Sequence, residues 1–222
     1  KNIFASMMIL HTRFLARLRA ACVLAPPVLA ASAVCQAAGG SGDASLYARR
    51  WVDAPNGGGG GGARLRVVQF STLADGLSGR HPSNGGFTES PPASLDWAYR
   101  RGRLVAEIFR HFDGAGPDVV ALQEVDHFEE LEAEMRRRGF EGAFRVKPES
   151  PCLRYTEGEL ADGCALFWRS DAVTLDELTT LNYPWLGPTG EPTGQASNQV
   201  AIVAQMRLLG AAAGAPFVVG VS

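Results

Sequence analysis

The chain has 222 residues, enough for one ordinary domain and a tail. Apolar residues make up 46% of it, which is within the globular range and predicts a sizeable core. The formal net charge of −2 excludes the broad basic surface that dominates non-specific nucleic-acid binding, so any nucleotide contact must be local. The cysteines form no CxxC pair and no histidine lies at zinc spacing from them, so the sequence predicts neither a zinc site nor a disulfide framework. We expect reduced thiols at Cys22, Cys35, Cys152 and Cys164.

Basic residues precede an Ala-rich apolar stretch near the beginning of the chain. Residues 13–19 carry three arginines, and Ala20–Val34 follows, interrupted by two prolines. This stretch is too short and too broken for a stable membrane span, and the pattern instead predicts a targeting segment over residues 1–35. An organelle (mitochondrion or plastid) is not separated from the secretory pathway by this pattern. A cytoplasmic protein with a low-complexity tail is the alternative.

A Gly/Ala-rich segment separates this region from the expected folded domain. Over residues 36–63 the composition shifts to Gly, Ala and Ser, ending in Gly57–Gly62. Such a segment buries too little apolar surface to offset its ordering entropy, so we interpret it as a flexible linker. The folded domain is expected over residues 64–222.

The first part of that domain alternates strands with a helix. Leu65–Phe70 is a short apolar run that predicts a strand, and Val119–Leu122 has the continuous apolar character of a strand buried on both faces. Between them, Ser94 is expected to cap a helix and Asp96 to lie in its first turn. Apolar residues recurring at i, i+4 predict the inner face of this helix, on Leu104, Ile108 and Phe112.

A second helix and a series of strands follow. Asp126 with Glu129 fits a capping pattern, and the inner stripe is predicted on Phe128, Leu131 and Met135. Further strands are expected at residues 142–146, 164–168, 200–208 and 217–221. Strands alternating with helices and then strands in succession predict a mixed α/β layered domain.

A carboxylate stands at the carboxyl end of the buried strand, in Leu122-Gln123-Glu124. Placing it there is costly unless it has a partner, and carboxylate oxygens are ligands that Mg²⁺ prefers. Strict alternation puts Glu124 on the same face as Val120 and Leu122. The structural alternative is a salt bridge or a helix cap at the strand end.

Five segments of the expected domain are informative in combination: Leu65–Leu77, Pro117–Phe128, Lys147–Cys152, Asp162–Phe167 and Ser197–Ile202. They include the motifs LQEVD, KPxSPC and DGCALF, whose combination is more specific than any one of them. The order and rough spacing of these segments resemble those of nocturnin and the related poly(A) deadenylases, a branch of the endonuclease/exonuclease/phosphatase superfamily.

The resemblance implies a fold and a set of site residues. The fold would be a four-layer α/β sandwich with two facing mixed β-sheets, of which the chain would hold roughly the first half. Glu124 matches the family's metal-binding glutamate, for Mg²⁺ with Mn²⁺ as an alternative. Lys147 matches a residue that contacts a substrate phosphate, although a solvated surface lysine is the other interpretation. Ser71 stands where the family usually has asparagine, and its hydroxyl is shorter and offers fewer hydrogen bonds than an amide.

The implied activity is Mg²⁺-dependent phosphoester hydrolysis. It would act as a 3′–5′ exoribonuclease on poly(A) ends or as a phosphatase of the 2′-phosphate of NADP(H), with no DNA partner expected. The resemblance also implies a later Asp-x-Asn pair, another Asp and a His beyond Ser222. We therefore expect the second sheet to be mostly missing here and the chain alone to be inactive and poorly stable. A catalytically impaired binding or scaffold relative and a truncated sequence are the alternatives.

Overall fold

The computed structural model describes residues 64–79, 86–110, 116–156, 159–210 and 216–222. All of them belong to one unit of the chain, Asp53–Ser222. The predicted targeting segment and linker, residues 1–63, lie outside these ranges, as does Phe112.

The first sheet has four strands in the order β1-β2-β4-β3 and is mixed. Strand β1 pairs in parallel with β2, whereas β4 pairs antiparallel with both β2 and β3. The strands are β1 Val67–Ser71, β2 Val119–Val125, β3 Phe140–Val146 and β4 Gly163–Arg169. All four strands therefore overlap the predicted ranges: β1 begins two residues later than expected, and β2, β3 and β4 are longer than expected.

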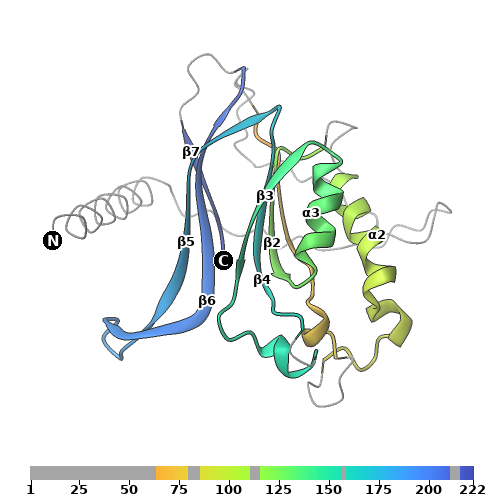
Figure 1. Ribbon diagram of the computed structural model, residues 1–222, viewed down its shortest axis with the longest axis vertical. Coiled ribbons are helices and arrows are strands. Elements are labelled where there is room, and N and C mark those ends of the chain that lie inside the picture. The colour runs from red at the N-terminus through yellow and green to blue at the C-terminus, as the bar shows by residue number, and fades with distance from the viewer. Residues whose placement is uncertain (1–63, 80–85, 111–115, 157–158, 211–215) are drawn as a thin grey trace, which may run out of the picture. The chain divides into compact units, whose positions relative to one another are not determined.

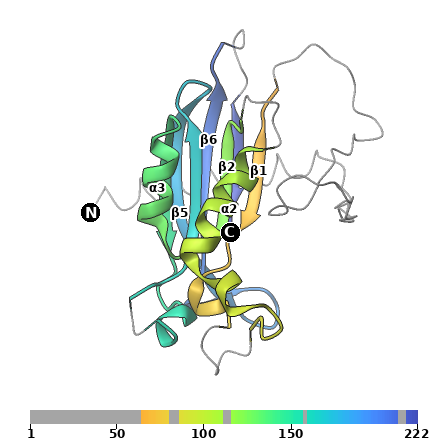
Figure 2. The same cartoon turned by 90° about the vertical axis from the view of Figure 1, so that its right-hand side faces the viewer.

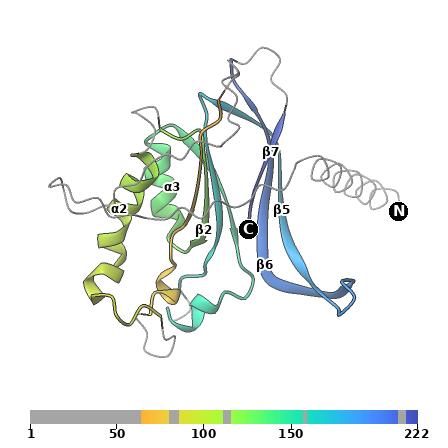
Figure 3. The ribbon, with the colours of Figure 1, turned by 180° about the vertical axis from the view of Figure 1, so that it is seen from behind.

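The second sheet has three antiparallel strands in the order β5-β6-β7 and faces the first (Figures 1 and 3). The strands are β5 Val173–Leu186, β6 Pro192–Leu208 and β7 Phe217–Val221. Sequence analysis expects this sheet to be mostly missing, whereas three of its strands are present and cover one face of the first sheet. Strand β5 escaped sequence analysis since acidic and turn-forming residues, Asp176, Glu177 and Pro184, interrupt its apolar pattern.

Two helices cover the opposite face of the first sheet and lie side by side in Figure 2. Helix α2 spans Trp97–Phe109 and helix α3 spans Phe128–Arg136. Asp96, and not Ser94, is the N-cap of α2, where its Oδ1 accepts a hydrogen bond of 3.0 Å from the amide of Ala98. Ser94 belongs to a short 3₁₀ helix that precedes α2.

The predicted cap of α3 is also wrong, whereas its inner stripe is confirmed. His127 occupies the N-cap position without a capping hydrogen bond from its side chain. Asp126 accepts instead from the backbone amide of Asp75, 51 residues earlier. Leu131 and Met135 are each 1% exposed and pack against the first sheet, because the i, i+4 spacing places them on one face of the helix.

The first sheet separates two hydrophobic cores. Alternating residues of β2 divide between them: Val120 and Leu122 pack with the helices, while Val119 and Ala121 pack against the second sheet. The core between the sheets also contains Cys164, Leu166, Trp168, Val200, Ile202 and Met206. The α/β fold with two facing sheets is thus as predicted. Among the described helices, none combines the length and apolar character needed to cross a membrane.

Candidate active site

The carboxyl ends of β1 and β2 lie side by side, because these two strands are parallel. Ser71, the last residue of β1, is in register with Gln123. The side-chain amides of Gln69 and Gln123 are joined by a hydrogen bond of 2.6 Å. This edge of the first sheet therefore brings the two sequence motifs QFS and LQE together.

A pocket of about 550 Å³ opens at this edge, between the two sheets. Three predicted site residues from separate segments, Ser71, Glu124 and Lys147, all line it. Its other lining residues come from both sheets: Gln69, Gln123, Gly163, Cys164, Gln199, Val200, Gly220 and Ser222. The volume lies within the range of small-molecule sites. The pocket thus has the size for a small ligand and a mainly polar wall on the first sheet.

Glu124 has an unusual backbone conformation, with φ at +56°. The pairing of β2 with β4 is interrupted between Leu122 and Val125, so the regular alternation of faces stops there. Gln123 and Glu124 consequently line the same pocket, while Val125 returns to the core under the helices. The expectation that Glu124 shares a face with Val120 and Leu122 is corrected by this irregularity.

Lys147 is not a solvated surface lysine. Its Nζ lies 2.6 Å from Oδ2 of Asp162, and its side chain is 17% exposed. The backbone amide of Lys147 also donates to the carbonyl of Asp162. The ammonium group is therefore held at the pocket wall by a carboxylate behind it.

Asp162 is the centre of a buried polar network. It is fully buried, and its Oδ1 accepts a hydrogen bond of 2.5 Å from Ser150 Oγ and lies 3.4 Å from Cys152 Sγ. Burial raises the pKa of the Cys152 thiol to about 11, so this cysteine is a protonated packing residue. Sequence analysis did not predict this role for Asp162. The separation of Asp162 from Lys147 in the sequence does not predict their contact, because pairing of β3 with β4 brings the two residues together.

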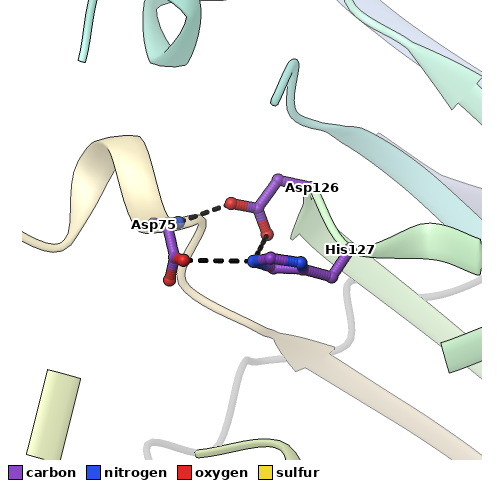
Figure 4. A group of neighbouring side chains, drawn as sticks. All are labelled: Asp75, Asp126 and His127. Atoms are coloured by element: carbon purple, nitrogen blue, oxygen red, sulfur yellow. Dashed lines mark hydrogen bonds and ion pairs between the residues drawn. The ribbon is translucent and has the colours of Figure 1, made fainter. Parts of the chain in front are cut away.

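A second acidic group, Asp75, Asp126 and His127, lies between the loop after β1 and the end of β2 (Figure 4). Nε2 of His127 lies 3.1 Å from Oδ2 of Asp75 and 4.0 Å from Oδ1 of Asp126. Arg100 lies 2.5 Å from the other oxygen of Asp75, and the His127 ring stacks on Trp97 with 4.3 Å between centroids.

The hydrogen bonds and ion pairs within this group favour a structural network. Burial tends to raise the pKa of Asp75, but hydrogen bonding and charge from His127 and Arg100 lower it below its usual value. Burial alone would lower the pKa of His127, whereas the hydrogen bond to Asp75 and the charges of Asp126 and Glu130 raise it. Because these side chains already form hydrogen bonds and ion pairs with one another and with Arg100, a metal ion would have to displace existing contacts.

Glu124 fits a divalent metal better than this network does. No basic side chain in the described part of the chain forms an ion pair with it, and it lines a pocket with polar neighbours. Mg²⁺ in enzymes commonly takes one or two protein carboxylates and completes its shell with water and substrate phosphate. The donor set around Glu124 therefore suits such an ion.

Residues 83–204 match the sequence profile of the Endonuclease/Exonuclease/phosphatase family, which is more than half of the chain. The chain therefore belongs to this family, whose members generally depend on divalent metals.

The chain is also similar to particular members. It is 36% identical to Drosophila melanogaster nocturnin over 147 residues, or 66% of this chain and 21% of that protein. Over 127 residues it is 32% identical to carbon catabolite repressor protein 4 homolog 6 of Arabidopsis thaliana, covering 57% of this chain and 15% of that protein. The solved catalytic domain of human nocturnin with bound sulfate superposes with a TM-score of 0.54 at 28% identity, covering 70% of this chain and 48% of that one.

These comparisons confirm the predicted resemblance. They also show that the chain spans only about a fifth of the Drosophila relative and about half of the solved domain.

Proposed function

We propose that the protein is a metal-dependent phosphoester hydrolase that acts on a nucleotide phosphate. The observation that carries this proposal is the meeting of Ser71, Glu124 and Lys147 in one pocket. Each comes from a different segment, and each lies in a motif that the sequence alone singles out. Family membership supports hydrolysis as the reaction class.

The roles of the residues follow from their chemistry. A Mg²⁺ ion bound by the Glu124 carboxylate would neutralise charge on the attacked phosphate and help to position the attacking water. The Lys147 ammonium, kept in place by Asp162, supplies a cation for a phosphate oxygen. Ser71 offers one hydroxyl at the same wall. Val200 and Gly220 of the second sheet close the opposite side.

Two substrates are consistent with this pocket: an adenylate-rich RNA 3′ end and the 2′-phosphate of NADP(H). Similarity to nocturnin and to a carbon catabolite repressor protein 4 homolog supports a nucleotide substrate in both cases. The pocket of about 550 Å³ accommodates a terminal nucleotide or part of a dinucleotide. The weak net charge of −2 favours a compact substrate over a long RNA.

The test compares both substrates on the full-length protein. Purified protein is assayed with a 3′-adenylated RNA and with NADP(H), with Mg²⁺, with Mn²⁺ and after chelation. We expect metal-dependent release of AMP or of inorganic phosphate, and loss of that activity in Glu124→Gln. Lys147→Met should raise KM more than it lowers kcat. Retention of full activity by Glu124→Gln would overturn the assignment.

A second candidate, a binding protein with impaired catalysis, is favoured by Ser71. This residue stands at the pocket wall with only a short hydroxyl where the family resemblance implies an amide. Binding of either substrate by the full-length protein without turnover, in the presence of metal, would support this candidate over the first.

A further inference from the structure

Two residues with left-handed backbones lie at the ends of β1 and β2. Leu73, just after β1, has φ at +61°, and Glu124, at the end of β2, has φ at +56°. Neither is glycine, and a left-handed conformation costs such residues of order 1–3 kcal/mol each. Conformations of this kind persist only where surrounding contacts fix them.

Thr72 supplies those contacts to Glu124. Its Oγ1 donates to the carbonyl of Glu124 at 2.7 Å and lies 3.1 Å from the carbonyl of Gln123. Its backbone amide donates to the Gln123 carbonyl at 2.9 Å. Thr72 is 6% exposed, so water does not readily replace these bonds. One side chain thus binds the peptide groups on both sides of the Glu124 α-carbon.

Arg100 of helix α2 fixes Thr72 in turn. Its Nη1 donates to the carbonyls of Thr72 and Leu73 at 2.9 and 2.8 Å, and its Nε donates to the carbonyl of Leu95 at 3.0 Å. Nη2 of the same guanidinium lies 2.5 Å from Asp75 Oδ1. The rigid fork of arginine suits several simultaneous bonds of this kind. The loop after β1 is therefore attached both to α2 and to the end of β2.

We propose that Thr72 is a positioning residue that aims the Glu124 carboxylate into the pocket. The left-handed φ of Glu124 is what turns its side chain toward the pocket beside Gln123. Without the Thr72 hydroxyl, the Glu124 carbonyl loses its partner and the backbone is free to relax toward an ordinary strand conformation, which turns the carboxylate away. This inference rests on the proposed function, because it takes Glu124 as the metal ligand.

The experiment measures metal affinity directly, apart from catalysis. Mn²⁺ is titrated into the full-length protein and followed by electron paramagnetic resonance, for the parent and for Thr72→Val, which keeps the shape of threonine without its hydroxyl. We expect binding to weaken roughly 10–100-fold, the usual effect of losing a group that orients a metal ligand. Thr72→Ser, which retains the hydroxyl, should restore affinity to within about threefold of the parent.

Thr156→Val is the matched control for a general loss of stability. Thr156 Oγ1 likewise donates to backbone carbonyls, at 3.0 Å to Cys152 and 3.3 Å to Leu160, but it does not contact Glu124. This variant should lower the thermal midpoint comparably and leave Mn²⁺ affinity unchanged. Equal loss of affinity in Thr156→Val and Thr72→Val would overturn the positioning role, since it would reflect stability alone.

Glu124→Gln separates failure of this inference from failure of the proposed function. If Glu124→Gln loses Mn²⁺ binding and Thr72→Val does not, the positioning role is wrong while the metal site stands. If Glu124→Gln binds Mn²⁺ as the parent does, both are wrong. Should Thr72→Val not fold, Thr72→Ala removes the hydroxyl with a smaller side chain, and an affinity equal to the parent's would likewise contradict the proposal.

Discussion

The ammonium of Lys147 lies 2.6 Å from Oδ2 of Asp162, and no solvent reaches that carboxylate. The pair connects the wall of the pocket to the interior, because Lys147 lines the pocket and Asp162 bonds to Ser150 behind it. A buried anion that holds a largely buried cation in place has consequences for both stability and binding.

Removing Lys147 should destabilise the fold. Lys147→Met leaves the buried carboxylate with only its neutral partners, and breaking a charged hydrogen bond of this kind costs about 1–3 kcal/mol. The free energy of unfolding is measured by urea denaturation of the full-length protein, with Asp162→Asn and the double variant completing a thermodynamic cycle. Additive effects of the two single substitutions would show that the pair makes no energetic contribution.

The variant Glu124→Gly should have a higher free energy of unfolding than the variant Glu124→Ala. At φ of +56° alanine keeps the strain of the left-handed region and glycine does not, so Glu124→Gly should exceed Glu124→Ala by about 1 kcal/mol in unfolding free energy. In an ordinary strand the order is reversed, because glycine pays more backbone entropy. Chemical denaturation of the two variants gives the sign. A free energy of unfolding for Glu124→Ala equal to or above that of Glu124→Gly would mean that Glu124 does not hold this conformation in solution.

The stability of the domain should fall as the pH rises above 6.5, the ordinary pKa of histidine, because of His127. The folded-state pKa of His127 is raised above 6.5, so its protonation stabilises the fold fully below the unfolded-state value. That contribution is lost as the pH rises through the folded-state pKa. Urea denaturation at a series of pH values should show that the free energy of unfolding falls with pH in the parent and falls less steeply in His127→Gln. The same slope in both proteins would assign the effect to another group.

Restoring an amide at position 71 should improve catalysis. Ser71 is exposed at the pocket wall, so Ser71→Asn has room for a longer side chain that provides both a donor and an acceptor. We expect kcat to rise by about tenfold or more, the order of effect of one well-placed hydrogen-bond donor. Steady-state kinetics on the better substrate provides the measurement, and Ser71→Gln serves as a control for amide chemistry at the wrong length. No gain in Ser71→Asn would mean that the serine already suffices.

Much of the fold could be predicted from the sequence because its signals are local. Continuous apolar runs predict β2 and β4, and the i, i+4 recurrence of Leu131 and Met135 predicts the buried face of α3. Helix caps were less predictable, since Asp126 had a distant partner in Asp75 that competed with the local one. Strand β5 was not predicted, because polar residues interrupt its apolar pattern although the strand is long and one of its faces is covered.

The sequence by itself determined which residues are candidates for the chemistry, because the motifs around Ser71, Glu124 and Lys147 single out all three. Only the tertiary structure decided that they share one pocket, that Glu124 leaves the alternation of its strand, and that Asp162 holds Lys147. The physical reason is that residue type and short-range periodicity are properties of neighbouring positions. A backbone irregularity fixed by Thr72 and an ion pair formed across β3–β4 depend on contacts between segments far apart in the chain.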